Sequence, residues 1–287
     1  MMESILSGLS EKVTERWAAL LVLPGIAFAM TLLLACWLRP LGATRQADPH
    51  AVVGRLDMLP HGWLRGETHQ VVLVGAGVLV ALVSAAAANE LSRFIGRFWL
   101  GRHRGIAWLM RRPLARRRTR ARAAVTDAAR YRVPEIYLPT RATRIGDCFL
   151  LVQRRVQVQY AVDLGRLWPR VWQLCGEGER VLTQQAWDQY SAAAVRAAWS
   201  VGYFVLALYW WPAVFIGVLL GPTACVVARR SAAGFAMAVE SLVDLKISET
   251  ATVLGVPLPQ GRFTRAEGAV LESIFDKGSM IPVPPVL

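Results

Sequence analysis

Long apolar runs separated by charged segments dominate the sequence and predict membrane-spanning helices. The first run, 17–38, is broken only by Pro24 and Gly25 and would form a helix of about 33 Å, enough to cross a hydrocarbon core of about 30 Å. The second run, 71–90, is uncharged up to Glu90 and rich in Val, Ala and Gly. A cleaved signal sequence is the alternative for the first run, but the acidic residues that precede it disfavour cleavage.

A third apolar run, 197–228, predicts a helical hairpin. Its middle, residues 209–212, reads Tyr-Trp-Trp-Pro, which is typical of an interfacial aromatic belt followed by a turn. Two crossings need about 40 residues, so we extend the hairpin to 192–230 and let Arg196 reach back to the headgroups. A re-entrant hairpin that enters the membrane and returns is the alternative. Both interpretations leave the two ends on the same side.

The remaining segments predict a helical domain outside the membrane. Between residues 145 and 156 apolar side chains recur at intervals of three or four, which is the spacing of a helix face. The alternation over 156–162 is a strand pattern, but the preceding run favours a helix. Further along the chain, Thr264 followed by Glu267 predicts a capping box at the start of a short helix.

Charge sets the predicted orientation. The chain is 54% hydrophobic and only 18% charged, yet its net charge is +13. Four arginines lie between the first two apolar runs, whereas eleven lie between residues 93 and 122. Because positively charged segments stay in the cytoplasm, we expect both termini to be cytoplasmic and the protein to lie in the plasma membrane.

These patterns predict an all-α integral membrane protein with four transmembrane helices, arranged as two hairpins, and a helical cytoplasmic domain. The predicted boundaries are a cytoplasmic N-terminus 1–16, a hairpin 17–92 (helices 17–38 and 71–90, outer loop 39–70), a basic cytoplasmic domain 93–191, a second hairpin 192–230 and cytoplasmic C-terminal helices with a Pro-rich tail 231–287.

Aromatic residues alternate with arginines directly after the second apolar run. This spacing predicts a helix lying in the membrane interface, with its rings toward the acyl chains and its guanidinium groups toward anionic lipid of the inner leaflet. A nucleic acid would recruit the same residue types, but the position beside a transmembrane helix favours lipid, so we expect no nucleic-acid partner. The candidate lipid-contacting residues are Arg93, Arg97, Trp99, Arg102, Arg104, Trp108, Arg111 and Arg112.

Small residues at helical spacing predict close helix packing. Gly77, Ala81 and Ala85 recur every four residues and would place small side chains along one face. Gly217 and Gly221 form a Gly-x-x-x-Gly pair. This pair would serve either association between copies of the chain or closure of the second hairpin on itself.

Four short motifs occur in a fixed order in the second half of the chain. They are Leu-Pro-Thr-Arg at 138–141, Ile-Gly-Asp at 145–147, Tyr-Ala-Val-Asp at 160–163 and Trp-Pro-Arg at 168–170. The set resembles a family of membrane proteins from high-GC actinobacteria, in which an LPTRLGN box, a helix, YGLD and WPRL precede an aromatic hairpin.

The chain departs from that family pattern at two positions. Asp147 stands where the pattern has Asn, and Ala161 stands where it has Gly. The resemblance covers about residues 131 to 260. It implies a predominantly helical membrane protein, and it implies no particular activity.

Sequence motifs for catalysis are missing. The chain has no phosphate-binding Gly-Lys-Ser/Thr loop, no Gly-x-Ser-x-Gly elbow and no His-Glu-x-x-His pair. His50, His61 and His69 share the predicted outer loop with Asp57 and Glu67, but their spacings match no familiar zinc-ligand set. We therefore predict no catalytic residue, no cofactor and no metal site. The uncharged spans also argue against an ion-coupled carrier.

The leading functional hypothesis is a non-catalytic membrane anchor or complex subunit that presents its cytoplasmic domain at the inner leaflet. Its alternatives are a homo-oligomeric channel and, third, an enzyme acting on lipid. We expect a protein partner or self-association, because Trp and Arg dominate binding hot spots. Packing at the lipid interface is an equal alternative for this candidate partner surface, which consists of Arg166, Trp168, Arg170 and Trp172.

Overall fold

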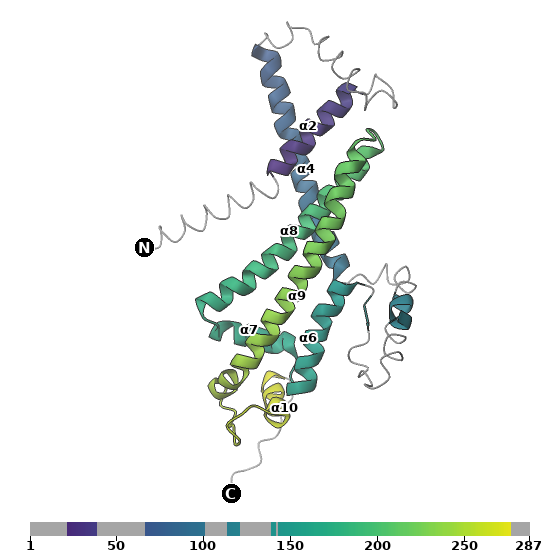
Figure 1. Ribbon diagram of the computed structural model, residues 1–287. Coiled ribbons are helices and arrows are strands. Elements are labelled where there is room, and N and C mark those ends of the chain that lie inside the picture. The colour runs from purple at the N-terminus through teal and green to yellow at the C-terminus, as the bar shows by residue number, and fades with distance from the viewer. Residues whose placement is uncertain (1–21, 39–66, 101–113, 121–138, 142, 277–287) are drawn as a thin grey trace. The chain divides into compact units, whose positions relative to one another are not determined.

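Every regular element in the described part of the chain is a helix, as predicted (Figure 1). The computed structural model describes residues 22–38, 67–100, 114–120, 139–141 and 143–276. Residues 114–120 form a short helix, and the seven longer helices are α2 (Leu23–Leu38), α4 (Glu67–Trp99), α6 (Arg144–Tyr160), α7 (Leu164–Leu174), α8 (Glu177–Ala207), α9 (Ala213–Val253) and α10 (Arg265–Phe275).

Helix α4 is longer than the helix predicted over 71–90. It continues through the predicted domain boundary at residue 93 and ends at Trp99. No proline interrupts this segment, and Glu90 pairs with Arg93 one turn later at 2.7 Å, which supports the continuing helix. The alternation over 156–162 does not produce a strand, because residues up to Tyr160 belong to α6. Residues 17–21 of the first predicted helix and 39–66 of the outer loop lie outside the described residues.

Contacts divide the chain into two compact units. One comprises Met1–Arg97 and Ser191–Ala228, and we call its described residues the apolar unit. The other comprises Phe98–Tyr190 and Arg229–Leu287, and we call its described residues the polar unit. The predicted second hairpin, 192–230, therefore lies almost wholly in the apolar unit. It consists of the end of α8, a turn at residues 208–212 and the start of α9.

Small residues and aromatic rings hold the apolar unit together. A Cβ atom at Gly25 of α2 would lie only 2.9 Å from the carbonyl oxygen of Ala81 in α4, so the two helices cross in close contact. The ring of Phe28 lies 5.7 Å from that of Trp199 and 5.3 Å from that of Tyr203, both on α8. Helix α2 thus packs against both α4 and the hairpin.

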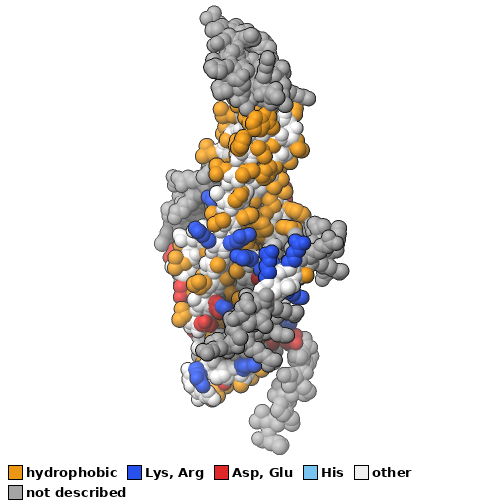
Figure 2. Space-filling view, turned by 45° about the vertical axis from the view of Figure 1, so that its right-hand side comes forward, with side chains coloured by type: hydrophobic (Ala, Val, Ile, Leu, Met, Phe, Trp, Pro, Cys, Tyr) orange, Lys and Arg blue, Asp and Glu red, His pale blue; other side chains and the backbone are white. Residues whose placement is uncertain are grey.

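The outer surface of the apolar unit is hydrophobic (Figure 2). Val74 and Leu79 on α4, and Phe215 and Leu219 on α9, expose more than 60% of their surface. Two described helices, Val74–Trp99 and Ala213–Val253, are long and apolar enough to cross a membrane. Only 11% and 22% of their most apolar windows are buried, so these windows are mostly exposed.

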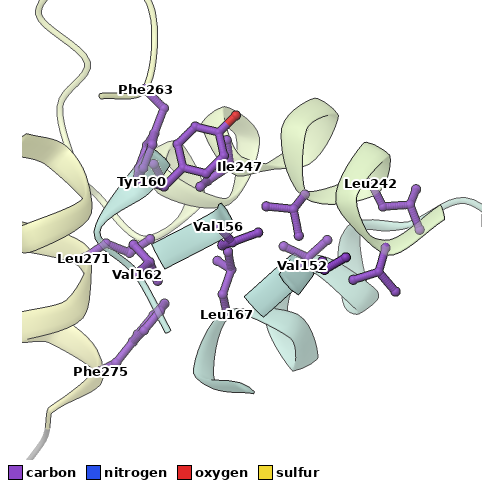
Figure 3. Packing of buried hydrophobic residues seen from close by; sticks show 14 of the residues in the cluster. Val152, Val156, Tyr160, Val162, Leu167, Leu242, Ile247, Phe263, Leu271 and Phe275 are labelled. Atoms are coloured by element: carbon purple, nitrogen blue, oxygen red, sulfur yellow. The ribbon is translucent and has the colours of Figure 1, made fainter. Parts of the chain in front are cut away.

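The polar unit has a hydrophobic core of its own (Figure 3). Helices α6, α7 and α10 and the second half of α9 contribute to it. Val156, Leu167, Val243 and Leu271 each expose 1% of their surface or less. Full burial of such a side chain stabilises the folded state by about 1.5–3 kcal/mol. The polar unit therefore has a hydrophobic core of its own, as a folded domain requires.

Two polar contacts fix α6 against α9 beside this core. Nη1 of Arg155 lies 3.1 and 3.2 Å from the two carboxylate oxygens of Glu240. One turn further along, the hydroxyl of Tyr160 donates to Asp244 at 2.8 Å. Burial, together with this hydrogen bond to a carboxylate, raises the pKa of Tyr160 to about 12, so the phenol remains a donor at neutral pH.

Helix α10 begins at the predicted capping box. The Glu267 carboxylate accepts from the backbone N–H of Thr264 at 2.8 Å, and the Thr264 hydroxyl accepts from the N–H of Ala266 at 3.3 Å. These contacts confirm the prediction made from the two residue types. The helix then approaches the end of α6 so closely that a Cβ atom at Gly268 would overlap the carbonyl oxygen of Tyr160.

Replacing Gly268 by alanine is expected to destabilise the protein by about 1–3 kcal/mol, because α10 must move away from a backbone oxygen. Gly234, an exposed glycine of α9 where an added Cβ atom would meet no other atom within 4 Å, is the matched control. Gly234→Ala should stabilise the helix by about 0.5–1 kcal/mol. Thermal unfolding of the purified full-length protein in detergent measures both changes. Equal effects of the two substitutions would contradict the close approach.

Ala161 ends α6 with a left-handed backbone, φ 58°, which L side chains other than Asn and Asp seldom adopt. Ala161→Gly is expected to stabilise the protein by about 1 kcal/mol, because glycine adopts this conformation without strain. As a control, Ala233→Gly in the exposed face of α9 should destabilise it by about 1 kcal/mol. Chemical unfolding of the two variants distinguishes relief of strain from a general effect of glycine.

Candidate functional site

The carboxylate of Asp147 organises the start of α6. It lies in the first turn of this helix, where a negative charge interacts favourably with the helix dipole. Its Oδ1 accepts from the backbone N–H of Thr140 at 3.0 Å and from that of Arg141 at 2.7 Å. One side chain thus fixes the loop that leads into the helix.

Asp147 also holds the short helix 114–120. Nη2 of Arg117 lies 2.7 Å from Oδ2 of Asp147, and Nη1 of the same arginine donates to the carbonyl oxygen of Arg141 at 2.7 Å. In addition, Nε of Arg118 donates to the carbonyl oxygen of Pro139 at 2.9 Å. A segment more than twenty residues earlier in the chain is therefore fastened to the same loop.

The loop is fastened to the end of α4 as well. The hydroxyl of Thr143 donates to the carbonyl oxygen of Trp99, and Nη1 of Arg141 donates to that of Leu100. These contacts satisfy two of the carbonyl groups that a helix C-terminus leaves without an intrahelical partner. A Cβ atom at Gly146 would lie 3.1 Å from the Trp99 oxygen, so the small residue of the Ile-Gly-Asp motif permits the approach.

We call this arrangement the Asp147 clamp. It consists of Thr140, Arg141, Thr143, Gly146 and Asp147, with Arg117 as its ion-pair partner. The clamp joins three separate segments: the end of α4, the helix 114–120 and the start of α6. The motifs at 138–141 and 145–147 therefore have a structural role that the motifs alone did not reveal. The one signal in the sequence was a carboxylate within an arginine-rich stretch, where Asp127 and Glu135 are the other acidic residues between Arg93 and Arg155.

An aromatic cluster lies beside the clamp in the polar unit. The ring of Tyr190, on α8, lies 6.1 Å from that of Trp99 and 6.0 Å from that of Phe149. Phe235, on α9, lies 5.6 Å from Phe149 and 5.5 Å from Trp187. Such pairs are typically worth about 0.5–1.5 kcal/mol beyond their buried area, so the rings connect four helices at this point.

The predicted lipid-contacting residues fall into two groups. Arg93 and Arg97 are exposed on the last turns of α4, and Trp99 lies in the aromatic cluster described above. They continue the second apolar helix and do not start a separate interfacial one. The other predicted residues, Arg102, Arg104, Trp108, Arg111 and Arg112, lie outside the described part of the chain.

The predicted small-residue face of α4 meets α2. Ala81 is buried, and a Cβ atom at Gly25 would lie 3.5 Å from the Cβ atom of Ala85. Gly77, one turn earlier on the same face, has no described atom within 4 Å of its Cβ position. Two of the three small residues of this face, Ala81 and Ala85, therefore pack against α2 of the same chain.

The Gly217 and Gly221 pair closes the second hairpin. A Cβ atom at Gly217 would lie 3.1 Å from the ring of Phe204, and one at Gly221 would lie 2.9 Å from the hydroxyl of Ser200. That hydroxyl donates to the carbonyl oxygen of Gly217 at 2.8 Å across the two helices. The two glycines therefore allow the arms of the hairpin to pack closely within one chain, which is one of the two roles predicted for the pair.

The predicted partner surface on α7 makes contacts with α10. Arg166 pairs with Glu272 at 3.0 Å, and the guanidinium of Arg170 lies 3.8 Å from the ring centroid of Phe275. The rings of Trp168 and Trp172 lie 5.5 Å apart, one helical turn from each other. The two arginines therefore help to dock α10, and both tryptophans are partly buried.

Candidate reactive groups were sought among the described side chains. Nowhere in these ranges do three His, Cys, Asp or Glu side chains gather closely enough to hold a metal ion. The side chains of His50, His61 and His69 lie outside what the structure describes. Burial raises the pKa of the Cys148 thiol, and the adjacent Asp147 carboxylate adds to the effect, so this thiol is a poor nucleophile at neutral pH.

Comparison with known proteins adds no relative. No protein-family model matches the chain, and no curated protein and no solved structure matches it either. The resemblance to actinobacterial membrane proteins therefore stays a prediction from the four motifs.

Removing the Asp147 carboxylate is expected to loosen the clamp. Asp147→Ala leaves two backbone N–H groups and Arg117 without their acceptor, so we expect a loss of about 2–3 kcal/mol. Asp147→Asn, which introduces the residue of the family pattern, keeps one acceptor oxygen and should cost about 1 kcal/mol. Denaturant unfolding of the full-length protein in detergent provides the comparison. Equal losses for the two variants would show that the backbone contacts are unimportant.

Proposed function

We propose that the protein is a non-catalytic membrane anchor that presents a folded helical domain at the inner face of the plasma membrane. In this proposal the apolar unit lies in the bilayer and the polar unit lies in the cytoplasm. The polar unit would bind a partner protein or serve as a subunit of a larger complex. Both termini are cytoplasmic in this scheme.

The contrast between the two units is the observation that carries the proposal. The apolar unit turns many of its large apolar side chains outward, as a bilayer requires. The polar unit also exposes some, such as Leu182, Met237 and Leu245, but it buries a contiguous apolar core that has an ion pair at its edge. Among the described side chains of the apolar unit, only Glu90, Arg93, Arg97 and Arg196 are charged. A protein with one unit of each kind is suited to holding a domain at a membrane.

The placement of charges along the long helices supports a topology of four spans. Helix α4 carries its first charge after the apolar stretch at Glu90, and the described part of α9 is uncharged until Arg229. Helix α8 carries its last charge at Arg196. Both arms of the hairpin are thus uncharged, from Ala197 to the turn and from the turn to Ala228, and a basic residue ends each arm at the side away from the turn.

Cysteine labelling tests the topology and separates crossing from re-entry. In a cysteine-free background, Leu208→Cys places a thiol in the turn of the hairpin, where Leu208 is 89% exposed. A membrane-impermeant maleimide added to intact cells should label this thiol if the hairpin crosses. Arg262→Cys in the polar unit should react only after permeabilisation. Labelling of Arg262→Cys in intact cells would contradict a cytoplasmic polar unit, and protection of Leu208→Cys would favour re-entry.

The same purified protein distinguishes the anchor from a channel. An anchor in liposomes should show no ion flux. The mass of its particle in mild detergent should also be the same for the wild type and Gly77→Leu. The substitution should not disturb the fold, because an added Cβ atom at Gly77 meets no described atom of its own chain within 4 Å. Flux that Gly77→Leu abolishes would replace the anchor by an oligomeric pore. Enzymatic turnover by the isolated protein would also contradict the proposal.

A further inference from the structure

The arginines of helix 114–120 divide into two kinds. Arg117 is three-quarters buried and its charge is paired with Asp147, as described above. Arg116, Arg118 and Arg120 are exposed. Arg144, at the first position of α6, is exposed as well. Arg117 and the Nε atom of Arg118 thus hold the helix in place, and Arg116, Arg120 and Arg144 extend from the surface of the polar unit.

This part of the polar unit has a large excess of positive charge. The described segments 98–100, 114–120, 139–141 and 143–150 contain six arginines and a single carboxylate, Asp147. That carboxylate is already engaged by Arg117 and by two backbone N–H groups. Arg116 and Arg120 lie one turn apart on the same side of a helix, where like charges repel. An anion between them would convert this repulsion into attraction.

The Asp147 clamp fixes where this charge lies along the chain. It hydrogen-bonds the carbonyl groups of Trp99 and Leu100, and Trp99 is the last residue of the membrane-length helix Val74–Trp99. The basic helix is therefore tied directly to the end of a candidate span. Nine helical residues, about 14 Å, separate Trp99 from Glu90, where the apolar stretch ends. The phosphate groups of a bilayer border such a stretch, so lipid phosphate is the nearest anion along the chain.

We infer that Arg116, Arg118, Arg120 and Arg144 form a site for the phosphate groups of anionic lipids, held at the bilayer surface by the Asp147 clamp. The planar guanidinium group matches phosphate oxygens in a two-pronged geometry. The four side chains come from two segments that are far apart in sequence, and the clamp brings these segments together. This inference rests on the proposed anchoring function and adds the lipid class that the domain prefers.

Lipid selectivity of the full-length protein tests the site. The protein is reconstituted in phosphatidylcholine bilayers that contain spin-labelled phosphatidylglycerol or spin-labelled phosphatidylcholine. The ratio of the two association constants is measured for Arg116→Gln/Arg120→Gln. The matched control is Arg262→Gln/Arg265→Gln, which removes the same charge from exposed positions outside the clamp. A basic residue near an anionic surface is worth about 1 kcal/mol, so selectivity should fall by about thirtyfold in the first variant.

The control variant should retain the selectivity of the wild type, and Arg116→Lys/Arg120→Lys should retain most of it because the charge is kept. Selectivity that is the same in all variants, or a wild type without preference for phosphatidylglycerol, would overturn the inference. Duplex DNA binding at physiological salt that Arg116→Gln/Arg120→Gln weakens would also overturn it in favour of a nucleic-acid surface.

Alkaline extraction of the reconstituted bilayers distinguishes failure of the phosphate site from failure of the anchoring proposal. A wild type that is released by carbonate contradicts the anchor itself. A wild type that is retained but shows no lipid preference contradicts only the phosphate site. The three arginine variants should all be retained, because none of them changes the apolar unit.

Discussion

The carboxylate of Asp147 is the interaction on which the arrangement around the end of α4 depends. Through two backbone N–H groups it shapes the loop before α6, and through Arg117 it secures the helix 114–120. The shaped loop then places Thr143 and Arg141 on the last carbonyl groups of α4. A hydrogen bond to an ionised group is typically worth about 1.5–3 kcal/mol. Since the loop and the helix 114–120 share this one acceptor group, and the loop in turn bonds the end of α4, the carboxylate constrains all three segments together.

The two units are stabilised by different means. In the polar unit, the hydrophobic effect drives apolar side chains of α6, α7, α9 and α10 into a core. Two ion pairs between arginine and glutamate at the edge of this core join neighbouring helices. A lipid environment offers no such driving force between helices, so close packing and interhelical hydrogen bonds take over. The apolar unit has both features. Gly25 brings α2 against α4, and the Ser200 hydroxyl bonds the backbone of the facing helix.

Uncharged apolar runs predicted the long helices, and an interval of three or four predicted α6, because apolar residues at that spacing mark a buried face whatever the partner is. The capping box at Thr264 and the turn at 209–212 were also predictable, since both depend on a few neighbouring residues. The end of α4 was missed, because arginines suggest a boundary although they are good helix formers. The clamp could not be derived, since its ion pair joins residues 117 and 147 across a segment with no pattern that fixes its path. The same holds for Gly268, whose role is set by the partner helix.

Under the proposed topology, the hydrogen bond between Ser200 and Gly217 would affect how the hairpin enters the membrane. A serine hydroxyl that enters hydrocarbon alone must give up its bonds to water without replacement. Here the acceptor is only a short hairpin away along the chain, so the two helices can form the bond before they leave water. Insertion of the arms as a closed pair therefore avoids a barrier that either helix would meet singly. In that topology the hairpin would be inserted as one unit, held by the same bond that joins its two arms in the folded structure.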